Sequence, residues 1–256
     1  MSDRVYHFVV GGLKFFWWHG DLIGEENLPQ TGPAVFIANH LDSTGPIACV
    51  CSIPLRMHLW GTEELMDPVK APAAMNKYFS EKELNLKPPV STWFSYLLTR
   101  ISLPLLRSLD CIPAHKGESG RLETLRLSME VLKQGKFLLI FPYDPAMEKD
   151  EATGIRPFRR TFARLGEMYH AETRECLRFY PVAAYAAGYV VVGKPAVFDP
   201  LNPLELERQR LTHLMENTVR EMYMRREMYM QLQTGNHSPR TVERMKKSIR
   251  SFDDTR

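Results

Sequence analysis

Short apolar runs rich in β-branched and aromatic residues alternate with longer amphipathic runs along most of this chain. AVFIAN (34–39), KFLLIFP (136–142) and RFYPVAAYAA (178–187) are typical of buried strands. The stretch 119–135 has leucines at helical spacing and closes on Gly135, a helix-stop signal. This alternation predicts an α/β fold: a mixed, mostly parallel central sheet flanked by helices. Further strands are expected at 56–61, 111–115 and 189–198, and further helices at 158–171 and 205–232.

The length of 256 residues suits one large domain with a full core. We expect an N-terminal segment over 1–23, an α/β domain over 24–232 and a polar C-terminal tail over 233–256. Within the α/β domain, an insertion is expected around 62–109, because four prolines interrupt the alternation between 62 and 89.

Charge and cysteine content exclude several classes of protein. Residues 1–204 carry 22 acidic and 22 basic side chains, so the net charge of +3 arises in 205–256. Such a small excess lacks the dense basic stripe of a nucleic-acid-binding protein, so no nucleic-acid partner is expected. The four cysteines have no metal-ligand spacing, which predicts reduced core residues of a cytosolic protein and no metal site.

Two apolar, aromatic segments indicate contact with a membrane surface. Residues 5–18 are too few for a bilayer-spanning helix, which needs about 20 residues, and no signal-peptide cleavage site follows them. Residues 90–109 are interrupted by Arg100, Pro104 and Arg107. Both suit helices lying in the interface, although 5–18 would equally suit a helix packed on its own domain. We therefore expect a peripheral protein on the cytoplasmic face of a membrane.

Polar residues follow three expected strands, where ligands gather in sheets of this kind. The first exit is NHLDSTGP, the second is HKGESGR and the third begins FPYDP and runs to RPFRR. One helix separates the second exit from the third, so those loops are expected side by side, with a histidine and several basic residues converging there. His115 and Lys116 in the second exit suggest either an anion pocket or simply an exposed strand end.

The collinear order of these motifs resembles the PlsC-type glycerolipid (1-acylglycerol-3-phosphate) acyltransferase family. The resemblance rests on GEENLPQTGPAVFIANH, CIPAHK, LKQGKFLLIFP, GIRPFRRTFARLG and YPVAAY followed by GKP, and spans roughly residues 24–197. It implies transfer of a fatty acyl group from acyl-CoA or acyl carrier protein, as co-substrate, to a hydroxyl of a glycerolipid or related acceptor. It implies no further cofactor.

His40 falls on the family's catalytic histidine, whose role is to take the proton from the acceptor hydroxyl as general base. The family's orienting Asp would fall at Gly45, so this sequence departs from the His-x4-Asp pattern. Asp42 is the candidate replacement, and Ser43 and Thr44 are further candidates to contact the imidazole or the substrate. Loss of the carboxylate costs a Ser-His-Asp enzyme on the order of 10⁴ in kcat.

This sequence also departs from the family pattern at the residues that hold the acceptor's phosphate. Lys116 stands where an Arg is expected, and Tyr143, Asp144 and Pro145 replace the Glu-Gly-Thr that should follow Phe141-Pro142. Asp144 would repel a phosphate, which favours an acceptor without one or with a different head group. Candidate substrate-binding residues are Lys116, Arg156, Arg159, Ser43, Thr44 and Tyr143.

Two departures from the pattern leave a second function open. A catalytically inactive relative that binds lipid or an acylated partner, and acts as an adaptor, would keep the scaffold and lose the polar site. A serine hydrolase is disfavoured, because the sequence has no Gly-x-Ser-x-Gly elbow.

Overall fold

The structure of this chain is a computed structural model. The residues that it describes are 6, 10–12, 14, 21–41, 44–115, 117–185 and 189–225. The expected C-terminal tail (233–256) and most of the N-terminal segment lie outside them.

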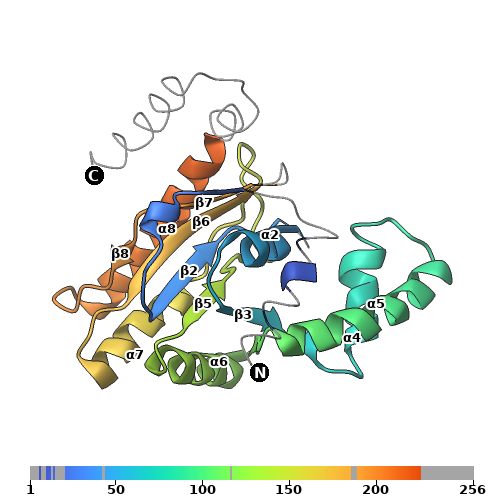
Figure 1. Cartoon of the computed structure of the whole chain (residues 1–256), viewed down its shortest axis with the longest axis horizontal. Helices are drawn as coiled ribbons and strands as arrows, with labels where there is room; N and C mark the ends of the chain where they lie inside the picture. Colours follow the sequence, from blue (N-terminus) through green and yellow to red (C-terminus); the bar gives the residue numbers. More distant parts are fainter. Residues whose placement is uncertain are drawn as a thin grey trace.

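An eight-stranded sheet forms the centre of the molecule (Figure 1). Its order is β1-β7-β6-β2-β5-β3-β4, with β8 paired to β6. The strands β6, β2, β5, β3 and β4 run parallel, whereas β7 is antiparallel to β6, so the sheet is mixed and mostly parallel as predicted. The strands are β1 (Asp21–Ile23), β2 (Ala34–Ala38), β3 (Met57–Thr62), β4 (Ile112–Ala114), β5 (Phe137–Ile140), β6 (Arg178–Tyr185), β7 (Tyr189–Val192) and β8 (Ala196–Val197).

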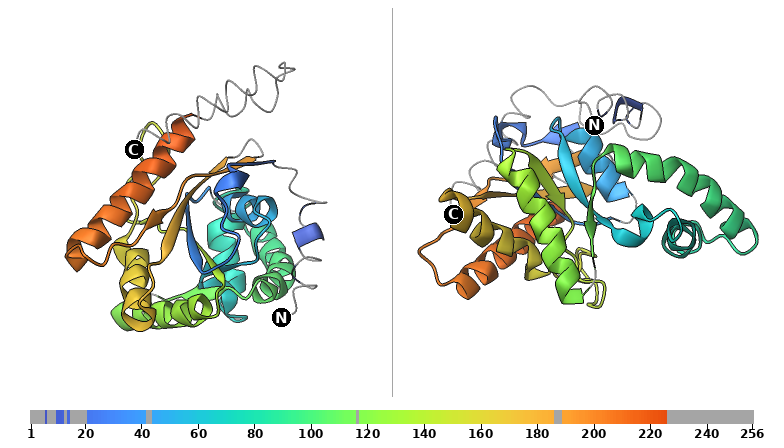
Figure 2. Two further views of the ribbon diagram at one scale, coloured as in Figure 1. Left: turned by 60° about the vertical axis from the view of Figure 1, so that its left-hand side comes forward. Right: turned by 90° about the horizontal axis from the view of Figure 1, so that it is seen from below.

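Helices cover both faces of this sheet (Figure 2). Side chains alternate along β2, so that Val35 and Ile37 face one apolar layer while Phe36 faces the other. The first layer is closed by α6 (Gly117–Lys133), α7 (Arg164–Thr173) and α8 (Leu204–Met224), and the second by α2 (Thr44–Ser52). Burial on both faces explains why the central strands are continuous apolar runs in the sequence.

The GEEN stretch that begins the family resemblance has a structural role. Gly24 has a φ of +81°, and a Cβ there would lie 2.1 Å from the carbonyl oxygen of Val192. Asn27, at the end of the short helix η1 (Glu25–Asn27), donates its side-chain amide to the same carbonyl at 2.8 Å. The motif therefore fastens the chain to the end of β7 just before β2 begins.

The segment 63–108, within the range where an insertion is expected, forms a helical hairpin that stands out from the β3–β4 edge of the sheet (Figures 1 and 2). It begins directly after β3 and returns to β4. Its elements are α3 (Glu63–Met66), α4 (Ala71–Met75), η2 (Asn76–Ser80) and α5 (Val90–Ser108).

Three expectations from the sequence are corrected. The loops after β4 and β5 are not side by side, because β3 lies between these strands. The helix α2 begins within the residues taken for a polar loop after β2. Among the cysteines, Cys49, Cys51 and Cys111 are buried and free, but Cys176 is exposed and does not belong to the core.

The two candidate membrane segments differ in exposure. In 5–18, Tyr6 and Val10 are buried against the body of the protein, and the Tyr6 hydroxyl donates to the Leu55 carbonyl at 3.2 Å. In 90–109, by contrast, α5 exposes several large apolar side chains. Within the described residues, no helix combines the length and apolar character needed to cross a bilayer.

Candidate active site

His40 lies two residues beyond the carboxyl end of β2, and its side chain is exposed. The strand is central in the sheet, between β5 and β6. Because β2, β5 and β6 are parallel, their carboxyl ends meet at one edge, where side chains from neighbouring exits converge. The imidazole is therefore open to a ligand at the edge of the sheet where such folds bind one.

Asn39 fixes the backbone on which His40 sits. Its buried amide donates from Nδ2 to the Ala184 carbonyl at 3.0 Å, and its Oδ1 accepts from the Ala184 N–H at 2.7 Å. The side chain thus extends the β2–β6 ladder past the last residue of β2. This explains why Asn precedes His40: a short amide reproduces the donor and acceptor of a strand residue.

Two aromatic rings from the exit of β5 hold the imidazole. The Phe141 ring meets it edge-on, with centroids 5.3 Å apart, and the Tyr143 ring lies tilted at 4.9 Å. These spacings are those of favourable aromatic contacts. Of the candidate substrate-binding residues that the structure describes, Tyr143 places its ring against His40.

Gly45 lies in the first turn of α2 and faces the backbone that carries His40. Its N–H donates to the Leu41 carbonyl at 2.9 Å. A Cβ at this position would lie 3.4 Å from the Asn39 carbonyl oxygen and 3.7 Å from the His40 carbonyl carbon. Position 45 thus lies beside the backbone of His40 and contributes no side chain to the site.

The other residues proposed near His40 are only partly described. Thr44 is the first residue of α2 and is half-buried. Asp42, Ser43 and Lys116 lie outside the described residues.

The two candidate arginines are bound by the loop that carries them. Arg159 Nη2 donates to Asp144 Oδ1 at 2.8 Å, and Arg156 donates to the Met147 carbonyl. The Arg159 guanidinium, with the Ala146 N–H, holds the pKa of the Asp144 carboxyl below its ordinary value. In this arrangement both guanidinium groups engage acceptors of the chain itself.

Glu216 on α8 holds the same loop in place, a role that no sequence motif indicated. Its Oε2 accepts from the Phe158 N–H at 2.8 Å, and Phe158 in turn forms an antiparallel bridge with Tyr143. Arg220 binds Glu216 Oε1 at 3.0 Å and Asp150 Oδ2 at 3.1 Å. The position of Tyr143 beside His40 therefore depends on a partly buried contact with α8.

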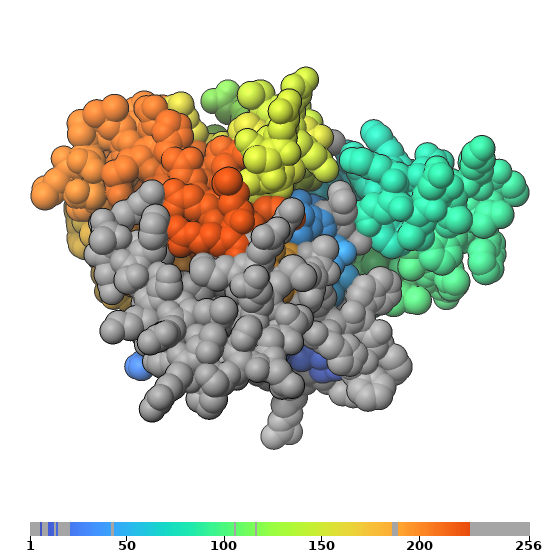
Figure 3. Space-filling view, turned by 90° about the horizontal axis from the view of Figure 1, so that it is seen from above, coloured from blue at the N-terminus to red at the C-terminus, as the bar shows by residue number. Residues whose placement is uncertain are grey.

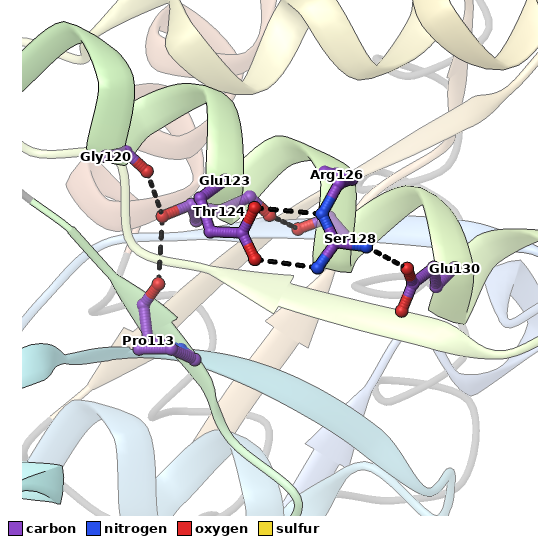
Figure 4. A network of polar contacts seen from close by, with 7 residues as sticks. All are labelled: Pro113, Gly120, Glu123, Thr124, Arg126, Ser128 and Glu130. Atoms are coloured by element: carbon purple, nitrogen blue, oxygen red, sulfur yellow. Dashed lines mark hydrogen bonds and ion pairs between the residues drawn. The ribbon is translucent and has the colours of Figure 1, made fainter.

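His115, at the exit of β4, is paired with a carboxylate of the chain. Its Nδ1 lies 3.0 Å from Glu63 Oε2, and this contact holds the pKa of Glu63 below its ordinary value. The backbone N–H of His115 donates to the Thr124 hydroxyl on α6. That hydroxyl lies within hydrogen-bond distance of the Gly120 and Pro113 carbonyls (Figure 4). The anion at His115 is thus Glu63, and this site is separated from His40 by two strands.

Two open hollows lie away from His40. One of about 340 Å³ includes His58, Asp110 and Lys136, at the amino ends of β3, β4 and β5. The other, of about 490 Å³, includes Cys176, Asp199 and Arg210 near the start of α8. Neither hollow includes a residue from the exits of β2 or β5. The candidate site is therefore identified by the polar residues around His40 and not by the volume of a cavity.

Comparison with known proteins agrees with this architecture. No protein-family model and no curated protein sequence matches the chain. Its structure is similar to that of PlsC, the 1-acyl-sn-glycerophosphate (LPA) acyltransferase of Thermotoga maritima, with a TM-score of 0.50 and 16% sequence identity. The match covers 87% of this chain and 83% of that one. The chain therefore has a PlsC acyltransferase-like fold.

Proposed function

We propose that this protein transfers a fatty acyl group from a thioester, acyl-CoA or acyl carrier protein, to a hydroxyl of a glycerolipid or related acceptor. The observation that carries the proposal is the exposed His40 imidazole just beyond the carboxyl end of β2, in contact with the rings of Phe141 and Tyr143. The acyltransferase-like fold supports the same reaction class.

The reaction needs one base at this position. The acceptor hydroxyl oxygen attacks the thioester carbonyl while an imidazole nitrogen of His40 takes its proton. The carbon–sulfur bond then breaks, and the thiolate leaves as the free thiol after taking up a proton. The ester formed carries the acyl group, so atoms and charge balance without a further cofactor.

The arginines favour an acceptor that places little negative charge at the β5 exit. Arg159 is neutralised by Asp144, and Arg156 is engaged by a backbone carbonyl. A phosphate at Arg159 would meet the negative charge of the Asp144 carboxylate beside it. This supports a hydroxyl acceptor without a phosphate, or with a different head group.

Gly45 supports a second candidate, a non-catalytic lipid-binding or adaptor protein. Because position 45 offers no carboxylate to orient the imidazole, His40 would be a weak base unless another group replaces that carboxylate.

The two functions are separated by measuring release of free thiol from palmitoyl-CoA with lysophospholipid and monoacylglycerol acceptors. Acyl transfer predicts that His40→Ala lowers turnover about 10²- to 10⁴-fold, the range typical of a general base. His213→Ala, at an exposed histidine of α8, is the matched control and should leave turnover unchanged. Turnover that survives His40→Ala contradicts the role of His40. A wild-type protein that binds vesicles but turns over no acceptor would be the adaptor.

A further inference from the structure

The helix α5 carries hydroxyl side chains on the face that it turns toward the protein. Ser91, Ser95 and Thr99 are buried, and Ser95 shares a hydrogen bond of 2.7 Å with Ser80 of the opposite arm. Ser95 and Thr99 also bond to carbonyls one turn earlier in the helix, at 2.7 and 2.8 Å. The inner face of this helix is therefore small and polar, and its packing leaves the large apolar side chains outside.

The outer face of α5 consists of Val90, Trp93, Leu97 and Ile101, spaced three and four residues apart. Their exposed fractions are 57%, 69%, 44% and 64%. This spacing places all four on one stripe of the helix. We call these four residues the α5 face. A contiguous apolar stripe of this kind on an exposed helix marks an interaction surface.

The hairpin presents this stripe away from the rest of the molecule. It projects beyond the sheet in Figure 1 and in the right-hand view of Figure 2, and the space-filling picture shows it at one end of the molecule (Figure 3). No described element packs over the α5 face, as the exposures of its residues show.

The positive charge of the hairpin is concentrated in side chains without an ion-pair partner. Residues 62–109 carry six Lys or Arg and five Asp or Glu, and two of the acidic residues, Glu63 and Asp67, are paired with Lys70. The exposed basic residues include Lys82, Lys87, Arg100 and Arg107, and none of these four has an ion pair among the described residues. Unpaired positive charge around an apolar stripe with an exposed Trp matches the requirements of a helix lying in an anionic membrane interface.

We propose that the α5 face docks this protein on an anionic lipid bilayer, with the apolar stripe inserted at the level of the head groups. A second copy of the chain fits the same surface poorly, because it would bring the unpaired basic side chains of two hairpins together. The proposal concerns the hairpin alone and does not depend on acyl transfer at His40.

The test is cosedimentation of the full chain with vesicles, in the absence of any acyl donor or acceptor. The wild type should bind vesicles of phosphatidylcholine mixed with phosphatidylglycerol more tightly than vesicles of phosphatidylcholine alone. Trp93→Glu/Ile101→Glu should weaken binding at least about tenfold, because two exposed apolar anchors are lost. Lys87→Glu/Arg100→Glu should weaken binding to the anionic vesicles alone, by about fivefold or more for each residue.

Leu206→Glu is the matched control, because Leu206 is 60% exposed but lies on α8. It should bind as the wild type does, and circular dichroism should show all variants folded. Undiminished vesicle binding by Trp93→Glu/Ile101→Glu overturns the proposal, as does a wild type that binds neither vesicle. A wild-type dimer that this variant dissociates, without vesicle binding, would identify a second copy as the occupant. Since no turnover is measured, a failed acyltransferase assay leaves these outcomes unaffected.

Discussion

The side-chain amide of Asn39 forms two hydrogen bonds with the backbone of Ala184, one in each direction, at the point where β2 ends. Asn39 is almost completely buried. The residue that precedes the candidate base is thus fixed to the neighbouring strand, and the orientation of His40 follows from that anchor.

We predict that Asn39→Ala lowers the free energy of unfolding by about 2–4 kcal/mol, because a buried N–H and a buried carbonyl both lose their partner. Urea unfolding followed by circular dichroism measures the effect. Gln134→Ala, at an exposed amide just after α6, should cost less. A free energy of unfolding unchanged by Asn39→Ala would contradict the anchoring role.

Position 45 offers a gain-of-function test of the candidate site. The nearest atoms to a Cβ there are at 3.4 Å or more, so a Cβ fits without displacing the backbone. An aspartate in the first turn of α2 also interacts favourably with the helix dipole. We predict that Gly45→Asp raises kcat for thioester turnover at least about tenfold, since such a carboxylate is worth up to about 10⁴ in a Ser-His-Asp triad.

Gly45→Asn is the control for this gain, because it adds similar volume without the negative charge. A gain in both variants would point to packing and not to orientation of the imidazole. No gain in Gly45→Asp would mean that another group already orients His40 or that the site is not catalytic.

The Asp144–Arg159 pair sets how much positive charge a ligand meets at the β5 exit. Because Arg159 keeps the pKa of Asp144 below its ordinary value, the pair is intact at neutral pH. We predict that Asp144→Ala frees Arg159 and tightens binding of a phosphate-bearing lysolipid about tenfold, the worth of a charge-assisted hydrogen bond. Isothermal titration calorimetry measures this affinity.

Stability should change little in Asp144→Ala, since exposed ion pairs contribute about 0–1 kcal/mol. Adding Arg159→Ala to Asp144→Ala should remove the gain in affinity. If the gain persists in the double variant, the phosphate is bound by other groups.

The sequence predicts those features of the fold that depend on local pattern. Continuous apolar runs mark β2, β5 and β6, because strands buried on both faces show no alternation, and Gly135 marks the end of α6. The placement of β3 between β4 and β5 could not be read this way, since strand order is decided by contacts distant in sequence. The helix α2 was hidden by Gly45 and Pro46, although proline is well tolerated in a first helical turn.

For the candidate site too, the sequence predicts some features and not others. A histidine at the end of a buried strand is visible in the sequence, and so is the absence of a carboxylate at position 45. The direction in which a long side chain points cannot be predicted from the sequence, because the protein itself offers hydrogen-bond acceptors that compete with a ligand. Arg159 donates to Asp144, and Arg156 donates to the carbonyl of a residue nine positions earlier. Glu216, which binds the loop at Phe158, lies 58 residues further along the chain.

Glu207 is a carboxylate fully buried near the start of α8, and it yields a prediction about pH. Arg210 donates to it at 2.7 Å, the Asp199 N–H at 2.9 Å and the Asn202 amide at 2.8 Å. Burial by itself raises the pKa of Glu207, but these donors outweigh it and lower the pKa below its ordinary value. The stabilisation from this carboxylate is therefore complete above the unfolded pKa of about 4.3 and is lost as the pH falls through the lower folded value.

We predict that Glu207→Gln lowers the free energy of unfolding at pH 7 by about 2–3 kcal/mol, because the amide weakens charge-assisted bonds and sets one donor against another. The difference from the wild type should shrink in acid, where the wild-type carboxyl is itself protonated. Glu205→Gln, at an exposed carboxylate two residues earlier, should change stability little at either pH. Urea unfolding of the three proteins at neutral and acid pH measures these differences in the free energy of unfolding. If the effect of Glu207→Gln is the same at both pH values, the hydrogen-bonding shape of the side chain and not its charge stabilises this turn.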